Sequence, residues 1–326
     1  MTVRSTSALL LVLALGCGRP PVPQVVEIQA SVGNDAVTGS GIASNLPAPV
    51  FSSTDWPAWR GPGHDGIAVG PAAPLEWSET KNVVWKLKLP GRGHSSPIIV
   101  GDGVFVETAD ESAQVQSVLG IDRHTGKGLW QTNILQGNFD TAHHQNSQAS
   151  STLASDGERL FATFLNDRRI YCSALSLAGE ELWRQEVGGF SSRHGYSASP
   201  VVYQGLVILA ADHEQGGFIA GLDRATGNII WRRKRPAGGS YASPRVVPLG
   251  GKDQVVICGC GRVMSYDPLT GVEYWSVPGT TEATVGSPVV SGDHVIVSGG
   301  YPGAETLAVD AGGKVVWRNK EKCYVP

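Results

Sequence analysis

Short hydrophobic runs separated by polar turns fill this chain from about residue 96 onward. The clearest unit follows Ser199–Pro200, where two β-rich runs joined by a tight turn at Gln204–Gly205 predict a hairpin. Two further apolar runs complete the unit, so that its four runs occupy 201–203, 206–210, 218–222 and 229–232. Outside the N-terminal 17 residues no long stretch has helical spacing of apolar residues. The pattern therefore predicts units of four antiparallel strands without helices.

One phrase recurs in these units: Asp, two residues, Thr-Gly, three residues, Trp. Complete copies begin at Asp122, Asp223 and Asp267, and shorter copies end at Trp183 and Trp317. The period of about 42 to 53 residues indicates a stacked or radial architecture. Four strands per repeat are typical of a β-propeller. We therefore predict an all-β fold, a β-propeller of four-stranded antiparallel blades, with about five to six blades present.

The repeated residues have mechanical roles. Asp at the start of the turn can accept hydrogen bonds from backbone N–H groups two and three residues further on. Gly after Thr supplies the positive φ that the turn needs, and Trp can fill the wedge between adjacent twisted sheets. We expect these positions to dock blades and not to perform catalysis: Asp122, Gly126, Trp130, Gly179, Trp183, Asp223, Gly227, Trp231, Asp267, Gly271, Trp275, Gly313 and Trp317.

The N-terminal segment resembles a bacterial lipoprotein signal. A positive charge at Arg4 precedes an apolar run that is too short to span a bilayer, and the run ends Leu-Ala-Leu-Gly-Cys at Cys17. This predicts a signal peptide over 1–17 and lipidation of Cys17, with an ordinary secretory signal as the alternative. Residues 18–50, rich in Pro, Gly, Ser, Ala and Val, predict a flexible tether, followed by the propeller over 51–326.

Export places the protein in the cell envelope, at the periplasm or outer membrane. Gly18 follows the cysteine and no Asp stands there, which favours the outer membrane. Net charge is −3, so composition gives no basic face for nucleic acid. Export permits disulfides among the remaining cysteines. Cys258 and Cys260 lie in a predicted strand and should face the same side, but their spacing is not that of a zinc site. Buried inert thiols are the preferred interpretation for Cys172, Cys258, Cys260 and Cys323.

The repeated phrase, preceded by Ser-Pro and a Val-rich hairpin, resembles the pyrroloquinoline-quinone (PQQ)-like β-propeller repeat. The resemblance covers 51–326, and the opening Asp55–Pro62 resembles the start of planctomycete-type secreted propellers. Relatives include quinoprotein dehydrogenases and BamB-type lipoproteins of outer-membrane protein assembly. The resemblance implies blades around a central channel, with each Trp docking one blade on the next.

Quinoprotein alcohol dehydrogenases in this family use adjacent cysteines, a Trp beneath the cofactor, and calcium held by Glu, Asn and Asp. This sequence has no adjacent cysteine pair, and no segment matches the calcium ligands. Fold alone does not supply an activity. We therefore expect no cofactor, with PQQ and calcium belonging only to an alternative, enzymatic interpretation. No nucleophile elbow or catalytic triad is evident, so no catalytic residue is assigned.

Repeat spacing raises the question of how many blades the ring has. After Trp231 and Trp275 the next Ser-Pro begins 12 residues later, whereas the same interval after Trp317 passes the last residue. With five repeats and one leading Trp85, a ring of seven or eight blades is not closed. We expect a C-terminally truncated sequence that lacks about two or three blades.

Histidine and tyrosine gather just before the Ser-Pro positions, where the chain should enter the innermost strand at one channel mouth. The candidate binding residues there are Arg92, His94, His143, His144, Asn146, Arg193, His194, Tyr196 and Tyr241. Converging histidines from several blades can bind a metal, a carboxylate or a peptide, although polar packing against loop backbone is the preferred interpretation. Adjacent His143 and His144 on an extended segment should point to opposite faces, so no metal site is assigned.

These observations favour a non-enzymatic, membrane-tethered extracytoplasmic propeller that binds proteins or peptides of the envelope as a scaffold. Outer-membrane protein assembly of the BamB kind is one version of this function, with edge pairing as a binding mode. The alternatives are a PQQ-dependent alcohol or sugar dehydrogenase and a carbohydrate-binding module that uses Trp56 and Trp59.

Overall fold

The structure, a computed structural model, describes residues 37–38, 43–70 and 72–321. The predicted signal peptide, Cys17 and most of the predicted tether lie outside these residues, as does Cys323. The described residues belong to the compact unit Ala36–Pro326. None of them forms a helix long and apolar enough to cross a membrane.

Five antiparallel sheets follow one another along the chain, each with its four strands hydrogen-bonded in sequence order. The first sheet contains β2 (Ile98–Val100), β3 (Gly103–Asp110), β4 (Val115–Asp122) and β5 (Gly128–Gln136), and the second contains β6 (Ala154–Ser155), β7 (Arg159–Asn166), β8 (Arg169–Ser176) and β9 (Glu181–Gly189). The third contains β10 (Val201–Tyr203), β11 (Leu206–Ala211), β12 (Phe218–Asp223) and β13 (Ile229–Lys234), and the fourth contains β14 (Arg245–Leu249), β15 (Lys252–Gly259), β16 (Arg262–Tyr266) and β17 (Glu273–Pro278). The fifth contains β18 (Val289–Ser291), β19 (His294–Gly299), β20 (Glu305–Asp310) and β21 (Val315–Asn319).

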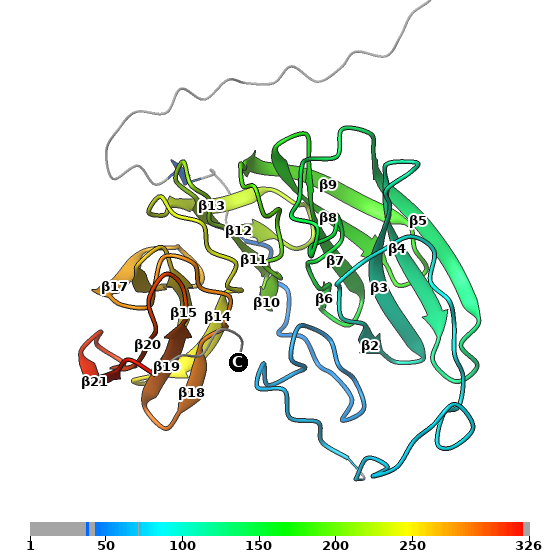
Figure 1. Cartoon of the computed structure of the whole chain (residues 1–326), viewed down its shortest axis with the longest axis horizontal. Coiled ribbons are helices and arrows are strands. Elements are labelled where there is room, and N and C mark those ends of the chain that lie inside the picture. The colour runs from blue at the N-terminus through cyan, green and yellow to red at the C-terminus, as the bar shows by residue number, and fades with distance from the viewer. Residues whose placement is uncertain (1–36, 39–42, 71, 322–326) are drawn as a thin grey trace, which may run out of the picture. The chain divides into compact units, whose positions relative to one another are not determined.

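This arrangement confirms the predicted all-β propeller, with five blades in the described part of the chain. The first strands of the middle sheets, β6, β10 and β14, lie toward the centre of the arrangement, and β10 contacts both of the others (Figure 1). Fourth strands such as β5 lie at the outside and alternate between exposed and half-buried positions, whereas all six residues of β11 are buried. Burial on both faces is expected for a strand enclosed between two neighbouring sheets.

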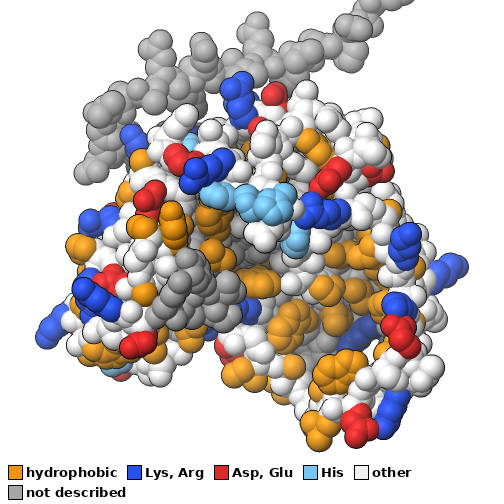
Figure 2. Space-filling model, in the orientation of Figure 1, with side chains coloured by type: hydrophobic (Ala, Val, Ile, Leu, Met, Phe, Trp, Pro, Cys, Tyr) orange, Lys and Arg blue, Asp and Glu red, His pale blue; other side chains and the backbone are white. Residues whose placement is uncertain are grey.

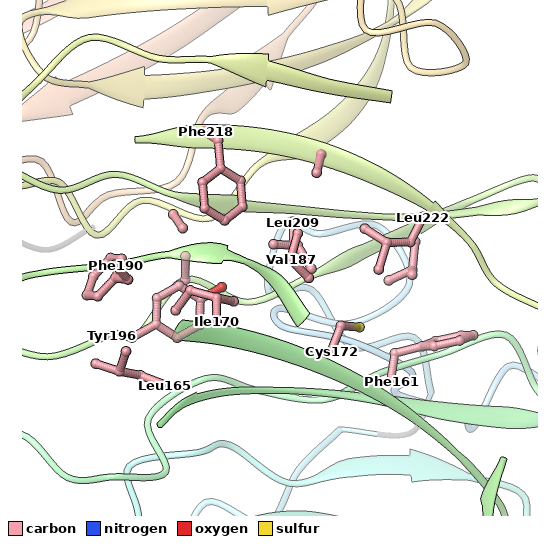
Figure 3. Packing of buried hydrophobic residues seen from close by; sticks show 14 of the residues in the cluster. Phe161, Leu165, Ile170, Cys172, Val187, Phe190, Tyr196, Leu209, Phe218 and Leu222 are labelled. Carbon is pink, nitrogen blue, oxygen red and sulfur yellow. The ribbon is translucent and has the colours of Figure 1, made fainter. Parts of the chain in front are cut away.

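Apolar clusters fill the space between consecutive sheets. Figure 3 shows the cluster between the second and third sheets, where Phe161 and Ile170 face Leu209 and Phe218. Similar clusters join the first sheet to the second, the third to the fourth, and the fourth to the fifth. Burying a large apolar side chain stabilises a fold by about 1.5–3 kcal/mol. The interior is therefore distributed over the seams between blades and not concentrated in one core.

Each seam between neighbouring sheets carries the same tryptophan contact. The indole N–H of the Trp donates to a carbonyl in the turn of the next sheet, and the ring covers the glycine of that turn. The donor–acceptor pairs are Trp85 to Arg123 at 2.7 Å, Trp130 to Leu177 at 3.0 Å, Trp183 to Arg224 at 3.2 Å, Trp231 to Pro268 at 3.1 Å, and Trp275 to Ala311 at 3.0 Å.

The turn glycine is required by both backbone angle and space. Gly227 has φ +78°, and a Cβ there would come within 2.6 Å of the Trp183 ring. The Asp that opens the turn accepts from the backbone: Asp223 Oδ1 binds the N–H of Ala225 at 2.9 Å and of Thr226 at 2.8 Å. Trp317 has no such neighbour among the described residues and is 42 % exposed.

A chain of serine and threonine side chains joins the first strands of successive sheets. Ser96 N–H donates to Thr152 Oγ1 at 3.0 Å, Thr152 N–H to Ser199 Oγ at 3.0 Å, and Ser199 N–H to Ser243 Oγ at 2.9 Å. In the second sheet Thr152 takes the place that serine has in the neighbouring sheets. The first four sheets are thus hydrogen-bonded to one another at their inner ends as well as at their outer turns.

The described part of the predicted tether contacts the third sheet. Strand β1 (Val37–Thr38) pairs antiparallel with β13. Ser44 N–H donates to the Asp223 carboxylate, and Arg224 Nη2 donates to Pro47 O at 2.6 Å. Residues 43–50 are thus bound to the propeller and not a free linker, because their backbone groups find partners there.

The following segment, 55–64, crosses the inner strands of several blades (Figure 1). Trp56 exchanges backbone hydrogen bonds with Ile99 at 2.8 and 2.9 Å, and Ser155 N–H donates to Pro57 O at 2.8 Å. Farther on, Arg245 Nη2 donates to Gly63 O at 2.8 Å. The Trp56 ring covers Gly61, so its contacts are internal.

Candidate binding cavity at the channel mouth

A cavity of about 920 Å³ opens at one mouth of the channel. Five of the nine predicted residues line it: His143, Asn146, Arg193, His194 and Tyr241. Figure 2 shows histidine side chains in a band beside a hollow on this face. Linkers that enter the second to fifth sheets supply most of the lining, which agrees with the predicted position of the mouth.

Aromatic rings form a connected row along the rim. The ring of His143 lies 4.2 Å from that of His144 and 5.5 Å from that of His194. His194 meets the edge of Tyr241 at 5.9 Å, and the Tyr241 hydroxyl lies 2.9 Å from His194 Nδ1. The hydroxyl of Ser192 is 3.4 Å from the same phenol. These contacts fix the rings while leaving their outer edges free for a ligand.

Backbone turns hold the two histidine segments together. Asn146 N–H donates to His143 O at 2.7 Å and closes a turn, and Asn146 Nδ2 donates to His194 O at 2.6 Å. Because His143 and His144 lie on this turn, their rings lie 4.2 Å apart at a tilt of 41°, and the prediction that they point to opposite faces is wrong. The predicted extended segment does not exist there.

Four predicted residues are not part of the cavity lining: Arg92, His94, His144 and Tyr196. Tyr196 is 6 % exposed and packs on Phe190, and its hydroxyl donates to Ala210 O at 3.1 Å, so its assignment to the mouth is wrong. The cause is the positive φ of Gly195, which turns the chain inward after His194. His94 bonds Ser147 at 3.0 Å. Arg92 donates to His144 O at 2.9 Å and so supports the loop from outside.

A buried ion pair positions the β11–β12 loop, which brings Glu214 and Gln215 into the lining. Arg235 donates to both carboxylate oxygens of Asp212, at 2.6 and 2.9 Å, and neither side chain is more than 3 % exposed. Burial alone would lower the pKa of Arg235, but Asp212 outweighs burial and raises it. Arg235 N–H also donates to Gly217 O at 2.9 Å, so the pair anchors both ends of the loop.

The cavity mixes acidic, basic and neutral groups. Desolvation, followed by the neighbouring His144 and His194, lowers the pKa of His143, so its ring is neutral at pH 7 and can both donate and accept. Burial raises the pKa of Tyr241, which keeps the phenol protonated. Glu214, Glu282 and Arg193 are the charged residues of the lining. Such a surface suits a ligand with amide, hydroxyl and charged groups.

Sequence reasoning missed several lining residues. Glu214, Glu282 and Tyr301 line the cavity, and Glu214 and Tyr301 come from loops between the second and third strands of a sheet. Only the linkers before each first strand were considered as the mouth. The polar stretch 212–217 was the available signal, because a hairpin loop of that length extends beyond the sheet.

Three cysteines lie within the described residues. Cys172, Cys258 and Cys260 are free thiols. Burial raises the pKa of Cys258 to about 12. Cys260 follows the end of β15 with φ +55°, so the prediction that it shares a strand face with Cys258 is wrong. Within residues 37–38, 43–70 and 72–321, no group of three or more His, Cys, Asp or Glu side chains could hold a metal ion.

Five sheets joined by one repeated Trp–turn contact define a PQQ-like β-propeller. Residues 68–136 and 114–325 match the family described as "Outer membrane protein assembly factor BamB". The chain therefore belongs to this family. Its described fold and its sequence repeat agree with that assignment.

Curated relatives carry the same description. The chain is 24% identical over 253 residues to outer membrane protein assembly factor BamB of Shewanella oneidensis, covering 74% of this chain and 57% of the relative. It is 26% identical over 241 residues to the Burkholderia pseudomallei protein, covering 69% and 52%. The chain thus spans about half the length of these relatives.

Solved structures support the fold. BamB from Moraxella catarrhalis superposes with a TM-score of 0.53 at 20% identity, over 75% of this chain and 69% of that one. A europium-containing methanol dehydrogenase gives a TM-score of 0.53 at 16% identity, over 70% and 51%. At these identities the likeness establishes the propeller alone, since BamB and a methanol dehydrogenase share the same fold.

Proposed function

We propose that this protein is an extracytoplasmic binding module that holds polypeptide segments in the mouth cavity during outer-membrane protein assembly. The observation that carries the proposal is the cavity of about 920 Å³, whose rim presents His143, His194 and Tyr241 beside charged groups. Pockets of about 300–1,000 Å³ bury most of a small ligand, so this one accommodates several side chains of an extended segment. The family assignment supports the biological setting.

Photo-crosslinking tests the proposal. Tyr301, which is 54 % exposed on the cavity lining, is replaced by a benzophenone amino acid, and the purified protein is mixed with an unfolded outer-membrane β-barrel polypeptide. Val272, 52 % exposed on a blade turn outside the lining, carries the same group as a matched control. We expect strong crosslinking from position 301 and little from 272. Equal crosslinking yields at positions 301 and 272 would show that the cavity is not the polypeptide-binding site.

The enzymatic alternative has a separate test. Purified protein is incubated with PQQ and calcium, and dye-linked oxidation of alcohols and sugars is measured. We expect no turnover above that of protein without quinone. Saturable, quinone-dependent oxidation would replace the binding function with a dehydrogenase.

Membrane tethering forms the second part of the proposal and rests on the signal-like sequence that ends at Cys17. We expect Cys17→Ser to move the exported protein from the membrane fraction to the soluble fraction, because the acyl chains that anchor it cannot be attached. Retention of the variant on membranes would show that lipidation at Cys17 is not the anchor.

A further inference from the structure

A second, basic cavity of about 520 Å³ lies between the second and third sheets. Its lining includes Arg168 and Arg169 from the β7–β8 turn, Arg232 from β13, and His213 from the β11–β12 loop. It shares Ser191 and Gln215 with the mouth cavity, so the two spaces are adjoining parts of one surface. Figure 2 shows blue basic side chains on both sides of the histidine band.

Arg232 is the central feature of this cavity because none of the described residues gives it an anionic partner. Its guanidinium lies over the Phe218 ring at 4.2 Å. Among the described residues no group accepts a hydrogen bond from it and no carboxylate pairs with it, although the side chain is half-buried. Burial lowers the pKa of Arg232, and no neighbouring charge compensates. A desolvated guanidinium with five N–H donors is costly without acceptors.

None of the other described charged residues that line this cavity pairs with the guanidinium of Arg232. Arg169 pairs with Glu186. The backbone N–H of Arg168 donates to Asp140 Oδ2 at 2.8 Å, and Arg168 lowers the pKa of that carboxyl while burial raises it. Asp167, the acidic residue of the lining, is exposed and forms no ion pair with Arg232 within the described residues. One uncompensated guanidinium beside one exposed carboxylate favours a ligand group with a single negative charge.

The backbone leaves room for the guanidinium of Arg232. A Cβ at Gly188 would lie 2.5 Å from Arg232 Nη2, so only glycine allows the guanidinium to occupy this place over β9. On the opposite side, Asp167 and Arg168 have φ +49° and +56°, which make the tight β7–β8 turn that brings Arg168 to the rim. Gly188 and the β7–β8 turn therefore keep basic side chains around the open cavity.

We propose that this basic cavity binds a carboxylate of the polypeptide held in the mouth cavity, either an acidic side chain or the C-terminus. The planar guanidinium of Arg232 donates two parallel hydrogen bonds to the two oxygens of a carboxylate. Arg168 reinforces the site from the rim, and Ser191 and Gln215 connect it to the mouth. This inference rests on the proposed function and specifies which polypeptide chemistry the site selects.

Fluorescence anisotropy with one polypeptide in two forms tests the inference. The probe is a labelled, unfolded outer-membrane β-barrel polypeptide, either native or with its carboxylates converted to neutral amides. We expect the unmodified protein to bind the native probe at least about tenfold more tightly than the amidated one. Arg232→Met should remove this preference by weakening only the native complex, because methionine keeps the apolar packing on Phe218.

Two further variants test whether the loss of preference is specific to the basic cavity. Arg233→Met, on the same strand but outside the lining, should retain the preference for the native probe. Arg168→Met changes an exposed residue and should weaken the native probe several-fold even if Arg232→Met fails to fold. Equal weakening of both probes by Arg232→Met, or no weakening by either lining variant, would overturn the carboxylate site.

Other outcomes separate this inference from the proposed function. If position 301 still crosslinks the amidated probe as strongly as the native one, the mouth binds polypeptide and the carboxylate site alone is wrong. If neither probe binds or crosslinks, both proposals fail. Displacement of the native probe by inorganic phosphate or by phosphatidylglycerol vesicles, but not by N-acetylglutamate amide, would assign the basic cavity to phosphate groups and contradict the inference.

Discussion

The seams between blades and the mouth of the channel are built in opposite ways. Each seam repeats one contact, in which a Trp indole donates to the next turn and covers its glycine; the series runs from Trp85, which precedes the first sheet and covers its turn, to Trp275 of the fourth sheet. At the mouth, different linkers supply different residues: His143 and Asn146 precede the second sheet, His194 the third, and Tyr241 the fourth. The seams therefore stabilise the fold, while the mouth is free to specify a ligand.

The strongest test of this difference removes one seam tryptophan. Trp231 is 1 % exposed, so Trp231→Ala should lower the free energy of unfolding by about 3–5 kcal/mol through the cavity that it leaves. Trp317→Ala changes the same repeat position where the side chain is 42 % exposed, and should cost about 1 kcal/mol or less. Urea unfolding of both variants measures the two costs. Equal costs would show that docking on the next turn contributes little.

A glycine pair on one turn gives the next largest effect. Gly126 has φ +71°, and a Cβ would meet the Trp85 ring at 2.5 Å, so Gly126→Ala should cost about 2–3 kcal/mol. Gly128, two residues further on, has open space around it, and Gly128→Ala should change stability by about 0.5 kcal/mol or less. Thermal unfolding distinguishes them. A tolerated Gly126→Ala would mean that the turn can move away from the indole.

A buried acid between the first and second sheets should make the free energy of unfolding depend on pH. Glu107 is 1 % exposed; Thr163 N–H donates to Oε1 at 3.3 Å, and Oε2 has no partner among the described residues. Burial raises its pKa well above 4.5. The folded state then binds the proton more tightly, so stability is greatest below the unfolded pKa and falls as pH rises toward the folded pKa, by up to about 1.4 kcal/mol per pH unit.

Glu107→Gln should therefore remove this fall. We expect the variant and the unmodified protein to be similar near pH 4 and the variant to be the more stable at pH 7. Denaturant unfolding across that range is the measurement. A steeper loss of stability in the variant than in the unmodified protein would contradict a protonated Glu107.

The smallest effect on stability is expected at the mouth. His194→Ala removes a half-buried rim ring and its contact with Tyr241, and should change the free energy of unfolding by about 1 kcal/mol or less. Thermal unfolding beside Trp231→Ala gives the comparison. A loss as large as that of the seam variant would mean that the rim is part of the structural core.

The same difference decides what the sequence could reveal. Seam residues recur at fixed positions, so Trp130, Gly179 and Asp223 were identifiable from the repeat without any structure. The number of strands per blade followed from the same period. The second sheet lacks the Ser-Pro marker, so its Thr152 is located by the hydrogen bonds to Ser96 and Ser199 and not by the repeat.

Mouth residues depend on loop paths, which periodicity does not encode. The positive φ of Gly195 places Tyr196 in the interior, although it stands beside His194 in sequence. Glu214 reaches the cavity because a buried ion pair fixes its loop. That no described carboxylate pairs with Arg232 is a property of its three-dimensional surroundings and has no signature in the sequence.

Affinity of His194→Ala for the unfolded β-barrel polypeptide tests the central claim most directly, because the variant should remain folded. The account predicts binding about tenfold weaker than that of the unmodified protein, with an unfolding midpoint close to the original. Unchanged affinity in a folded His194→Ala variant would contradict the assignment of binding to the channel mouth.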